Sequence, residues 1–247
     1  MKVVAAIKKL ALFLTIFMVI GLSGCSTADS PEPAGEPGPL IGGLGDEESL
    51  TLPPITGEEG SLKDLIYQRV SRRDFSDKAL ELDQAAILLW SAGGINIDGV
   101  TGPTRAIPSA GATYPLDFYL VAGNVTGLEP GVYSYDYVNH LLVAVSEGDK
   151  LELLANAALN QNFIADAPAA IVMVAFYERT TERYGERGGR YVHMDAGYAS
   201  QNVYLMAVEM GLITVAIGAF NDGEVAEILS TGGEPLLIMP VGLPAGD

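Results

Sequence analysis

The segment Arg69-Val70-Ser71-Arg72-Arg73 brings three guanidinium groups and a hydroxyl together within five residues. It holds three of the eight arginines of a chain that carries 31 acidic residues against 14 lysines and arginines. Guanidinium groups donate paired hydrogen bonds that fit the oxygens of a phosphate, and Ser71 adds a further donor. A structural alternative exists, because arginines in the last turn of a helix also complement its dipole. Both interpretations are open on these five residues alone.

A second segment with possible chemistry is Pro108-Ser109-Ala110-Gly111-Ala112-Thr113-Tyr114-Pro115, which runs directly into an expected strand. Small residues allow its backbone to come close to a flat ligand. A tight loop before a strand would use the same glycine and prolines. At the end of another expected strand, Ile217-Gly218-Ala219 again permits a close approach of backbone.

Three further arginines, at positions 179, 183 and 187, are spaced by four residues, and a glutamate precedes each of them. On a helix this spacing would give a solvated stripe of ion pairs. Glycines at positions 185, 188 and 189 disfavour a helix and favour an ordered loop that directs the arginines and Tyr184 toward a ligand.

These segments, in this order, resemble the nitroreductase superfamily of FMN enzymes, and within it the SagB/ThcOx-type dehydrogenases. The resemblance covers residues 65–244, nearly all of the expected globular part. It implies contacts with FMN for Arg69, Ser71 and Arg73 at the phosphate, for Pro108, Ser109 and Gly111 beside the flavin, for the Gln161 amide near the flavin, and for Gly218 and Ala219 at the ring edge. It also implies an intertwined homodimer with FMN at the interface.

The function implied by the resemblance is an FMN-dependent oxidoreductase that moves a hydride through flavin N5. Tyr114, Tyr184 and Tyr198 are the candidates for catalytic proton donation to the substrate. The alternatives are a tethered flavin-binding protein without turnover and a peptide dehydrogenase that converts azolines to azoles. The branch often has His at the helix position of Tyr198, and no lysine follows Lys150. Both departures weigh against azoline oxidation.

An α+β fold is expected from the order of the predicted elements. Hydrophobic periodicity, caps and turns predict helices over residues 61–70, 84–92, 149–159, 191–210 and 221–229, and strands over 116–122, 131–136, 141–145, 169–177, 213–219 and 236–241. Asp83 is the expected cap of the second helix. The helix over 191–210 is apolar on nearly every face and is predicted to be buried on all sides. The family resemblance implies that a mixed central sheet is flanked by helices.

The N-terminal region has a basic start, an apolar run over residues 10–22 and small residues before Cys25, which predict a secretory signal peptide over 1–24. Leu22-Ser23-Gly24-Cys25 resembles the lipobox of prokaryotic lipoproteins, in which Cys25 would be lipidated. The alternative is an uncleaved membrane anchor. Residues 25–60 are expected to form a flexible, lipid-anchored linker, and 61–247 the FMN-binding domain. The expected location is the cell envelope, outside the cytoplasm.

The composition of the chain argues against several classes of binding partner. A net charge of −17 argues against nucleic acid and anionic lipid surfaces. Cys25 is the single cysteine, so the domain lacks thiolates for a metal, and His140 and His193 are each expected to be packed or solvated. The expected partners are therefore a small-molecule or peptide substrate, the membrane through the lipid anchor, and an envelope redox partner in place of cytoplasmic NAD(P)H.

Overall fold

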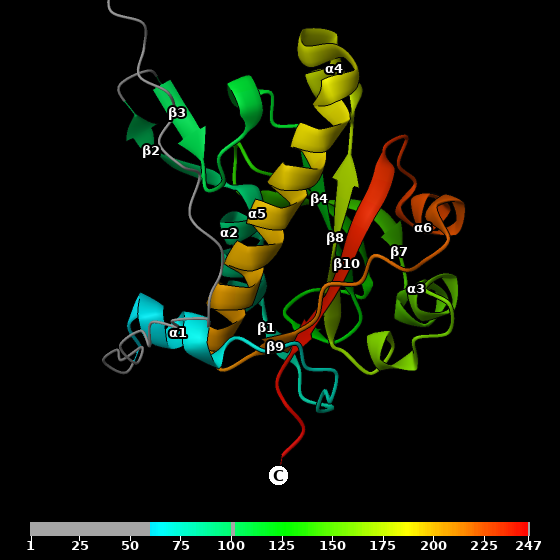
Figure 1. Ribbon diagram of the computed structural model, residues 1–247. Coiled ribbons are helices and arrows are strands. Elements are labelled where there is room, and N and C mark those ends of the chain that lie inside the picture. The colour runs from blue at the N-terminus through cyan, green and yellow to red at the C-terminus, as the bar shows by residue number, and fades with distance from the viewer. Residues whose placement is uncertain (1–59, 100–101, 247) are drawn as a thin grey trace, which may run out of the picture. The chain divides into compact units, whose positions relative to one another are not determined.

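The computed structural model describes residues 60–99 and 102–246 (Figure 1). The predicted signal peptide, Cys25 and the linker up to residue 59 lie outside the described residues. Among the described helices, none combines the length and apolarity needed to cross a membrane.

The α+β architecture consists of one six-stranded sheet between helices. The elements, in chain order, are α1 (Leu62–Gln68), β1 (Leu80–Glu81), α2 (Leu82–Gly93), β2 (Ile95–Gly99), β3 (Gly102–Arg105), β4 (Leu116–Ala122), β5 (Val125–Thr126), β6 (Gly131–Asp136), β7 (Leu141–Glu147), α3 (Leu151–Ala157), β8 (Ala169–Ala175), α4 (Glu178–Tyr184), α5 (Gly188–Glu209), β9 (Ile213–Thr214), α6 (Asp222–Leu229) and β10 (Glu234–Gly242). The large sheet has the order β7-β6-β4-β8-β10-β9 with antiparallel neighbours. A parallel pair joins β1 to β5.

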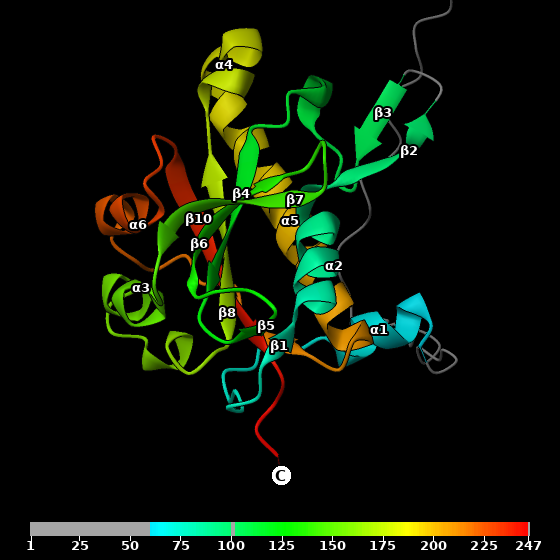
Figure 2. The same cartoon turned by 180° about the vertical axis from the view of Figure 1, so that it is seen from behind.

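Two cores lie on opposite faces of this sheet. Helices α2 and α5 cover one face, and α3 and α6 cover the other (Figures 1 and 2). Strand β8 is buried along its whole length, because alternate residues such as Ile171 and Val172 point into different cores. This layered arrangement confirms the α+β fold with a helix-flanked sheet.

The helix starts follow from capping chemistry. Ser61 caps α1 as expected, since its hydroxyl accepts the N–H of Asp64 at 3.3 Å. The expected cap of α2 at Asp83 is wrong. Glu81 takes that place because its own N–H donates to the Gln84 side chain at 3.1 Å in a reciprocal capping box.

The strand predicted over residues 213–219 is much shorter in the structure. Only Ile213–Thr214 forms a strand, and a single bridge joins Ile217 to Ile238 further along. Between them, the N–H of Ala216 donates to the Tyr204 hydroxyl at 2.8 Å in place of a neighbouring strand. A side chain from α5 therefore ends the strand early.

Helix α5 is not buried on all sides, contrary to the prediction. Met194 and Tyr198 are each 46% exposed, and residues four apart lie on one face of a helix. Ile87 and Trp90 on α2 are also exposed. A single chain therefore leaves part of its α2 and α5 surface uncovered.

Candidate functional site

The arginine segment extends past the end of α1 and contacts α5. The hydroxyls of Ser71 and Tyr204 are 2.8 Å apart, and the Arg69 guanidinium lies 5.2 Å from the centre of the Tyr204 ring. Arg73 lies 5.5 Å from the ring centre of Phe163. In contrast, Arg72 forms an ion pair with Asp74 at 2.5 Å, and its hydrogen bond lowers the pKa of that carboxyl.

Arg69 and Arg73 are suited to an anion. Within residues 60–99 and 102–246, neither forms an ion pair with a carboxylate, although the chain has an excess of acids. Arg69 is half-buried, while Ser71 and Arg73 are exposed. Two guanidinium groups beside an exposed hydroxyl therefore fit a phosphate from solvent.

The predicted ring-edge residues meet Gln161 in the structure. The Gln161 side-chain amide donates to the carbonyls of Ala158 at 2.8 Å and Ala219 at 3.0 Å. Gly218 is exposed, and a Cβ there would make only ordinary contacts, the nearest at 3.9 Å with Leu236 and Leu237. Packing inside this chain therefore does not require glycine at 218, whereas close approach of a ligand would.

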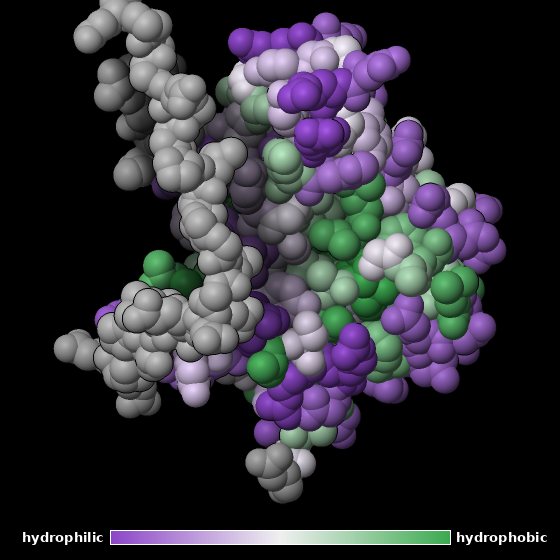
Figure 3. All heavy atoms as spheres, viewed as in Figure 1, coloured by the Kyte–Doolittle hydropathy of each residue, from purple (hydrophilic) through white to green (hydrophobic). Residues whose placement is uncertain are grey.

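One face of α5 lies next to the segment that leads from β9 to Gly218. His193, Gly197 and Tyr204 share that face, because eleven residues are about three helical turns. A Cβ on Gly197 would meet nothing within 4 Å, so the face is open there. Figure 3 shows apolar surface in green to the right of α5, where β10 and the segment after β9 lie in Figure 1.

Tyr177 and His193 form a pair that sequence reasoning missed. The Tyr177 hydroxyl and His193 Nε2 are 2.5 Å apart, and the rings meet edge to face. Burial, followed by the charges of Glu234 and Asp222, raises the pKa of Tyr177. The helical spacing of His193 and Tyr204 could have predicted that the two residues share a face of α5. The sequence could not place Tyr177 beside them, because Tyr177 follows β8.

The predicted loop, residues 108–115, packs on α4. Arg183 Nη1 donates to the Gly111 carbonyl at 3.0 Å, and a Cβ on Gly111 would lie 2.5 Å from the Tyr184 hydroxyl. The structure thus brings Gly111 and Tyr184 together. The φ of +60° at Gly111 favours glycine, and a side chain there would have to displace the ends of Tyr184 and Arg183.

Residues 178–184 form a helix, and its polar side chains contact other elements. Arg179 forms a bidentate pair with Asp117 on β4 at 2.7 and 2.9 Å, and Thr180 and Thr113 hydroxyls are 2.7 Å apart. Residues 178–187 are helical, so the ordered loop favoured by the glycines is wrong, and within the described ranges the alternative glutamate–arginine stripe does not form either. Helix α4 therefore holds the loop and β4 in place.

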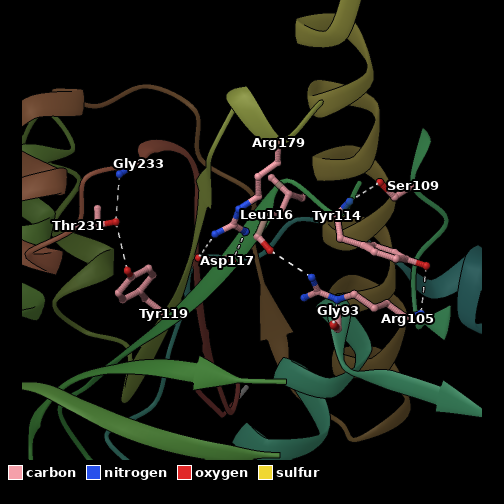
Figure 4. A network of polar contacts seen from close by, with 10 residues as sticks. All are labelled: Gly93, Arg105, Ser109, Tyr114, Leu116, Asp117, Tyr119, Arg179, Thr231 and Gly233. Carbon is pink, nitrogen blue, oxygen red and sulfur yellow. Dashed lines mark hydrogen bonds and ion pairs between the residues drawn. The ribbon is translucent and has the colours of Figure 1, made fainter. Parts of the chain in front are cut away.

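An open cavity of about 550 Å³ borders the loop at the ends of β4 and β6. Tyr114, Tyr135 and Tyr137 line it, together with the paired Asp117 and Arg179. Figure 4 shows Tyr114 and this ion pair around the end of β4. The volume lies within the range of small-molecule sites. Among the described residues, no cluster of His, Cys, Asp and Glu could hold a metal ion.

The candidate residues form two groups on opposite faces of α5. Ser71 contacts Tyr204, whereas Ser109 donates a hydrogen bond to Asp195. Nine residues are two and a half turns and about 14 Å of helix, so Asp195 and Tyr204 point in opposite directions. We define the phosphate half as Arg69, Ser71, Arg73, Gln161, Gly218 and Ala219, and the loop half as Pro108, Ser109, Gly111, Tyr114 and Tyr184. Tyr198 belongs to neither and lies on the exposed face of α5.

The family model described as "Nitroreductase family" matches residues 66–243 of this chain. This chain belongs to the nitroreductase family. Members of this family are oxidoreductases that in general bind FMN, and their fold is commonly homodimeric.

Three relatives of this nitroreductase family member differ in sequence identity and in the length of the match. A Methanocaldococcus jannaschii protein whose name places it among the nitroreductases is 45% identical over 199 residues, covering 81% of this chain and 98% of the relative. The trifolitoxin-processing protein TfxB of Rhizobium leguminosarum bv. trifolii is 34% identical over 113 residues, which are 44% of this chain and 30% of that protein. The microcin B17-processing protein McbC of Escherichia coli is 27% identical over 131 residues, or 48% of its length.

Solved structures share the fold. A crystal structure from Ralstonia eutropha JMP134, also named as a nitroreductase, has a TM-score of 0.66 and 29% identity, covering 80% of this chain and 89% of that one. A chain of the E. coli microcin synthetase McbBCD complex has a TM-score of 0.62 at 22% identity, covering 82% of this chain and 80% of its own. At that identity the second likeness is one of fold alone.

Proposed function

We propose that this protein is an FMN-dependent oxidoreductase whose site is built from the phosphate half of one copy and the loop half of another. The observation that carries the proposal is the attachment of the two halves to opposite faces of α5, through Tyr204 and Asp195. Because the helix lies between them, one flavin cannot contact both halves of the same chain. A second copy can supply the missing half.

The phosphate half has the groups that FMN needs. Arg69, Ser71 and Arg73 would hold the phosphate, and the exposed backbone at Gly218 and Ala219 would face the ring. When bound, FMN supplies hydride chemistry that amino-acid side chains lack. The protein contributes position, charge and the exclusion of water.

Uncovered apolar surface supports a homodimer. No residue of α1 is buried, and its Leu62, Ile66 and Tyr67 are more than half exposed. Helices α2 and α5 also carry exposed apolar side chains, namely Ile87, Trp90, Met194 and Tyr198. Exposed apolar side chains gathered on a surface mark protein–protein interaction sites.

Proton donation to the substrate is proposed from the loop half. Tyr184 lies directly over Gly111, and Tyr114 borders the 550 Å³ cavity. In a composite site these hydroxyls would come from the copy that does not hold the phosphate. Tyr198 faces the proposed dimer surface instead, and Tyr177–His193 is a further hydroxyl–imidazole pair on the phosphate side of α5.

FMN retention tests this proposal. The double variant Arg69→Ala/Arg73→Ala should lose FMN on desalting, because the phosphate loses both of its charged donors. Arg72→Ala is the matched control from the same segment and should keep the wild-type flavin absorbance, since Asp74 holds that side chain away. Full FMN occupancy in the double variant would overturn the phosphate assignment.

Turnover separates an enzyme from a flavin-binding protein without catalysis. The bound flavin should bleach with a reductant and recover its colour in air. The similarity to TfxB and McbC favours a peptide substrate as a second candidate, although the absence of lysine after Lys150 weighs against azoline oxidation. Incubation with an azoline peptide tests it, because each azole formed has lost two hydrogens.

The proposal places the protein in the cell envelope through lipidated Cys25. It rests on the sequence of the first 25 residues, outside the described part of the chain. Cys25→Ser should move the protein out of the membrane fraction and abolish labelling by a fatty-acid probe. Labelling of Cys25→Ser at the wild-type level would contradict lipidation at Cys25.

A further inference from the structure

The loop half has an unusual backbone that other groups must hold. Gly111, Ala112 and Tyr114 have φ values of 60°, 54° and 44°. Residues with a Cβ rarely adopt this left-handed region, because the Cβ crowds the following carbonyl. Such conformations persist only where surrounding contacts impose them.

Asp195 contacts the loop through Ser109. The Ser109 hydroxyl accepts the N–H of Tyr114 at 3.0 Å and donates to the Asp195 carboxylate. Asp195 is only 2% exposed. Burial raises its pKa, while the Ser109 hydrogen bond and the charge of Arg105 act in the opposite direction. A carboxylate is therefore kept in a position that disfavours its charge.

Arg105 holds the other end of Tyr114. Its backbone N–H donates to the Tyr114 hydroxyl at 3.3 Å, and its guanidinium lies 5.3 Å from the centre of that ring. Nε donates to the Gly93 carbonyl and Nη1 to the Leu116 carbonyl at 3.4 Å. Figure 4 shows Tyr114 between Ser109 at its backbone and Arg105 at its hydroxyl.

Asp195 and Arg105 are two buried charged side chains that both contact the loop. Arg105 is 7% exposed, and its Nη2 has no hydrogen-bond partner within the described chain. We propose that Asp195 and Arg105 are positioning residues, which fix the loop through Ser109 and Tyr114 and so set how one copy presents residues 108–111 to FMN held by its partner. This inference rests on the proposed function.

The test compares Asp195→Asn and Ser109→Ala with the wild type, in the full chain. Ser109→Thr keeps the hydroxyl and serves as the rescue variant, and Glu152→Gln, at an exposed position of α3, is the control. The first readout is amide hydrogen exchange of residues 108–115 without FMN. The second is the visible circular dichroism of bound FMN, which reports the geometry around the flavin and not stability.

We expect Asp195→Asn and Ser109→Ala to speed exchange in the loop several-fold and to change the FMN dichroism in the same way. Because both act on one contact, the double variant should add little to either single one. Ser109→Thr, which keeps the hydroxyl, should return loop exchange toward the wild-type rate, and Glu152→Gln should match the wild type in both readouts. If Asp195→Asn fails to fold, the comparison of Ser109→Ala with Ser109→Thr still shows whether the Ser109 hydroxyl fixes the loop.

Wild-type exchange and dichroism in Ser109→Ala would overturn the inference while leaving the proposed function intact. If the wild type binds no FMN, the proposed function fails, and so does the flavin role of the pair. Exchange in the loop would then still show whether Asp195 and Ser109 hold its conformation. The two failures are therefore distinguishable.

Discussion

The hydroxyls of Ser71 and Tyr204 lie 2.8 Å apart, and the same Tyr204 oxygen accepts the N–H of Ala216. One phenol thus joins the arginine segment, α5 and the chain that leads to Gly218. Two segments of the phosphate half, the arginine segment and the chain before Gly218, are therefore held together at a single oxygen atom of α5.

Tyr204→Phe should therefore weaken FMN binding and also destabilise the fold. It leaves the Ala216 N–H without its partner, at a cost of about 1–3 kcal/mol. Urea unfolding measures the stability, and flavin fluorescence titration measures the dissociation constant. Tyr133→Phe is the control, since its hydroxyl donates to the Glu129 carbonyl at 2.7 Å in the turn before β6. Equal effects of the two variants on FMN affinity would contradict the role of Tyr204.

Gly111→Ala should disturb the loop half. The new methyl group would meet the Tyr184 hydroxyl at 2.5 Å and Arg183 Nη1 at 2.8 Å, on a residue with φ of +60°. Gly148 has a similar φ of +84° but nothing within 4 Å of its Cβ position. Both substitutions carry the backbone cost of about 1–2 kcal/mol, and Gly111→Ala adds a steric clash. Thermal unfolding with FMN titration should show the larger loss for Gly111→Ala, and a Gly148→Ala loss of equal size would argue against close packing by α4.

The pH dependence of stability should report the burial of Asp195. Its pKa is raised in the folded protein, so the folded state binds this proton more tightly than the unfolded state does. Its contribution to the free energy of unfolding therefore becomes more favourable as the pH falls through the folded pKa. The measurement is the difference in unfolding free energy between the wild type and Asp195→Asn at pH 7.5 and at weakly acid pH. That difference should shift in favour of the wild type at the lower pH, and a flat or opposite trend would show that Asp195 is not desolvated.

Much of the fold could be predicted from local patterns. Strands β4 and β6 have the predicted bounds, because apolar runs end at turn-forming neighbours such as Pro115 and Gly123. The family resemblance assigned the phosphate to Arg69 and Arg73 and left out Arg72, which the structure pairs with Asp74. Alternate residues of an extended segment point to opposite sides.

The features that were missed depend on partners far away in the sequence. Strand β9 ends early because the Tyr204 hydroxyl accepts the hydrogen bond of the Ala216 N–H. No local pattern of residues 213–219 predicts this contact. Arg179 pairs with Asp117, a partner 62 positions earlier, and not with its neighbouring glutamates. The exposure of Met194 shows the same limit, since an apolar helix face does not reveal whether its own chain covers it.

The most direct test of the composite site is a mixed dimer of two defective chains. One chain carries Arg69→Ala/Arg73→Ala, and the other carries Gly111→Phe with a different affinity tag. Each homodimer should bind no FMN. A site that combines halves of different copies is intact once in the mixed dimer, so we predict one FMN per purified heterodimer. No FMN in the heterodimer would show that both halves act within one chain and would contradict the account.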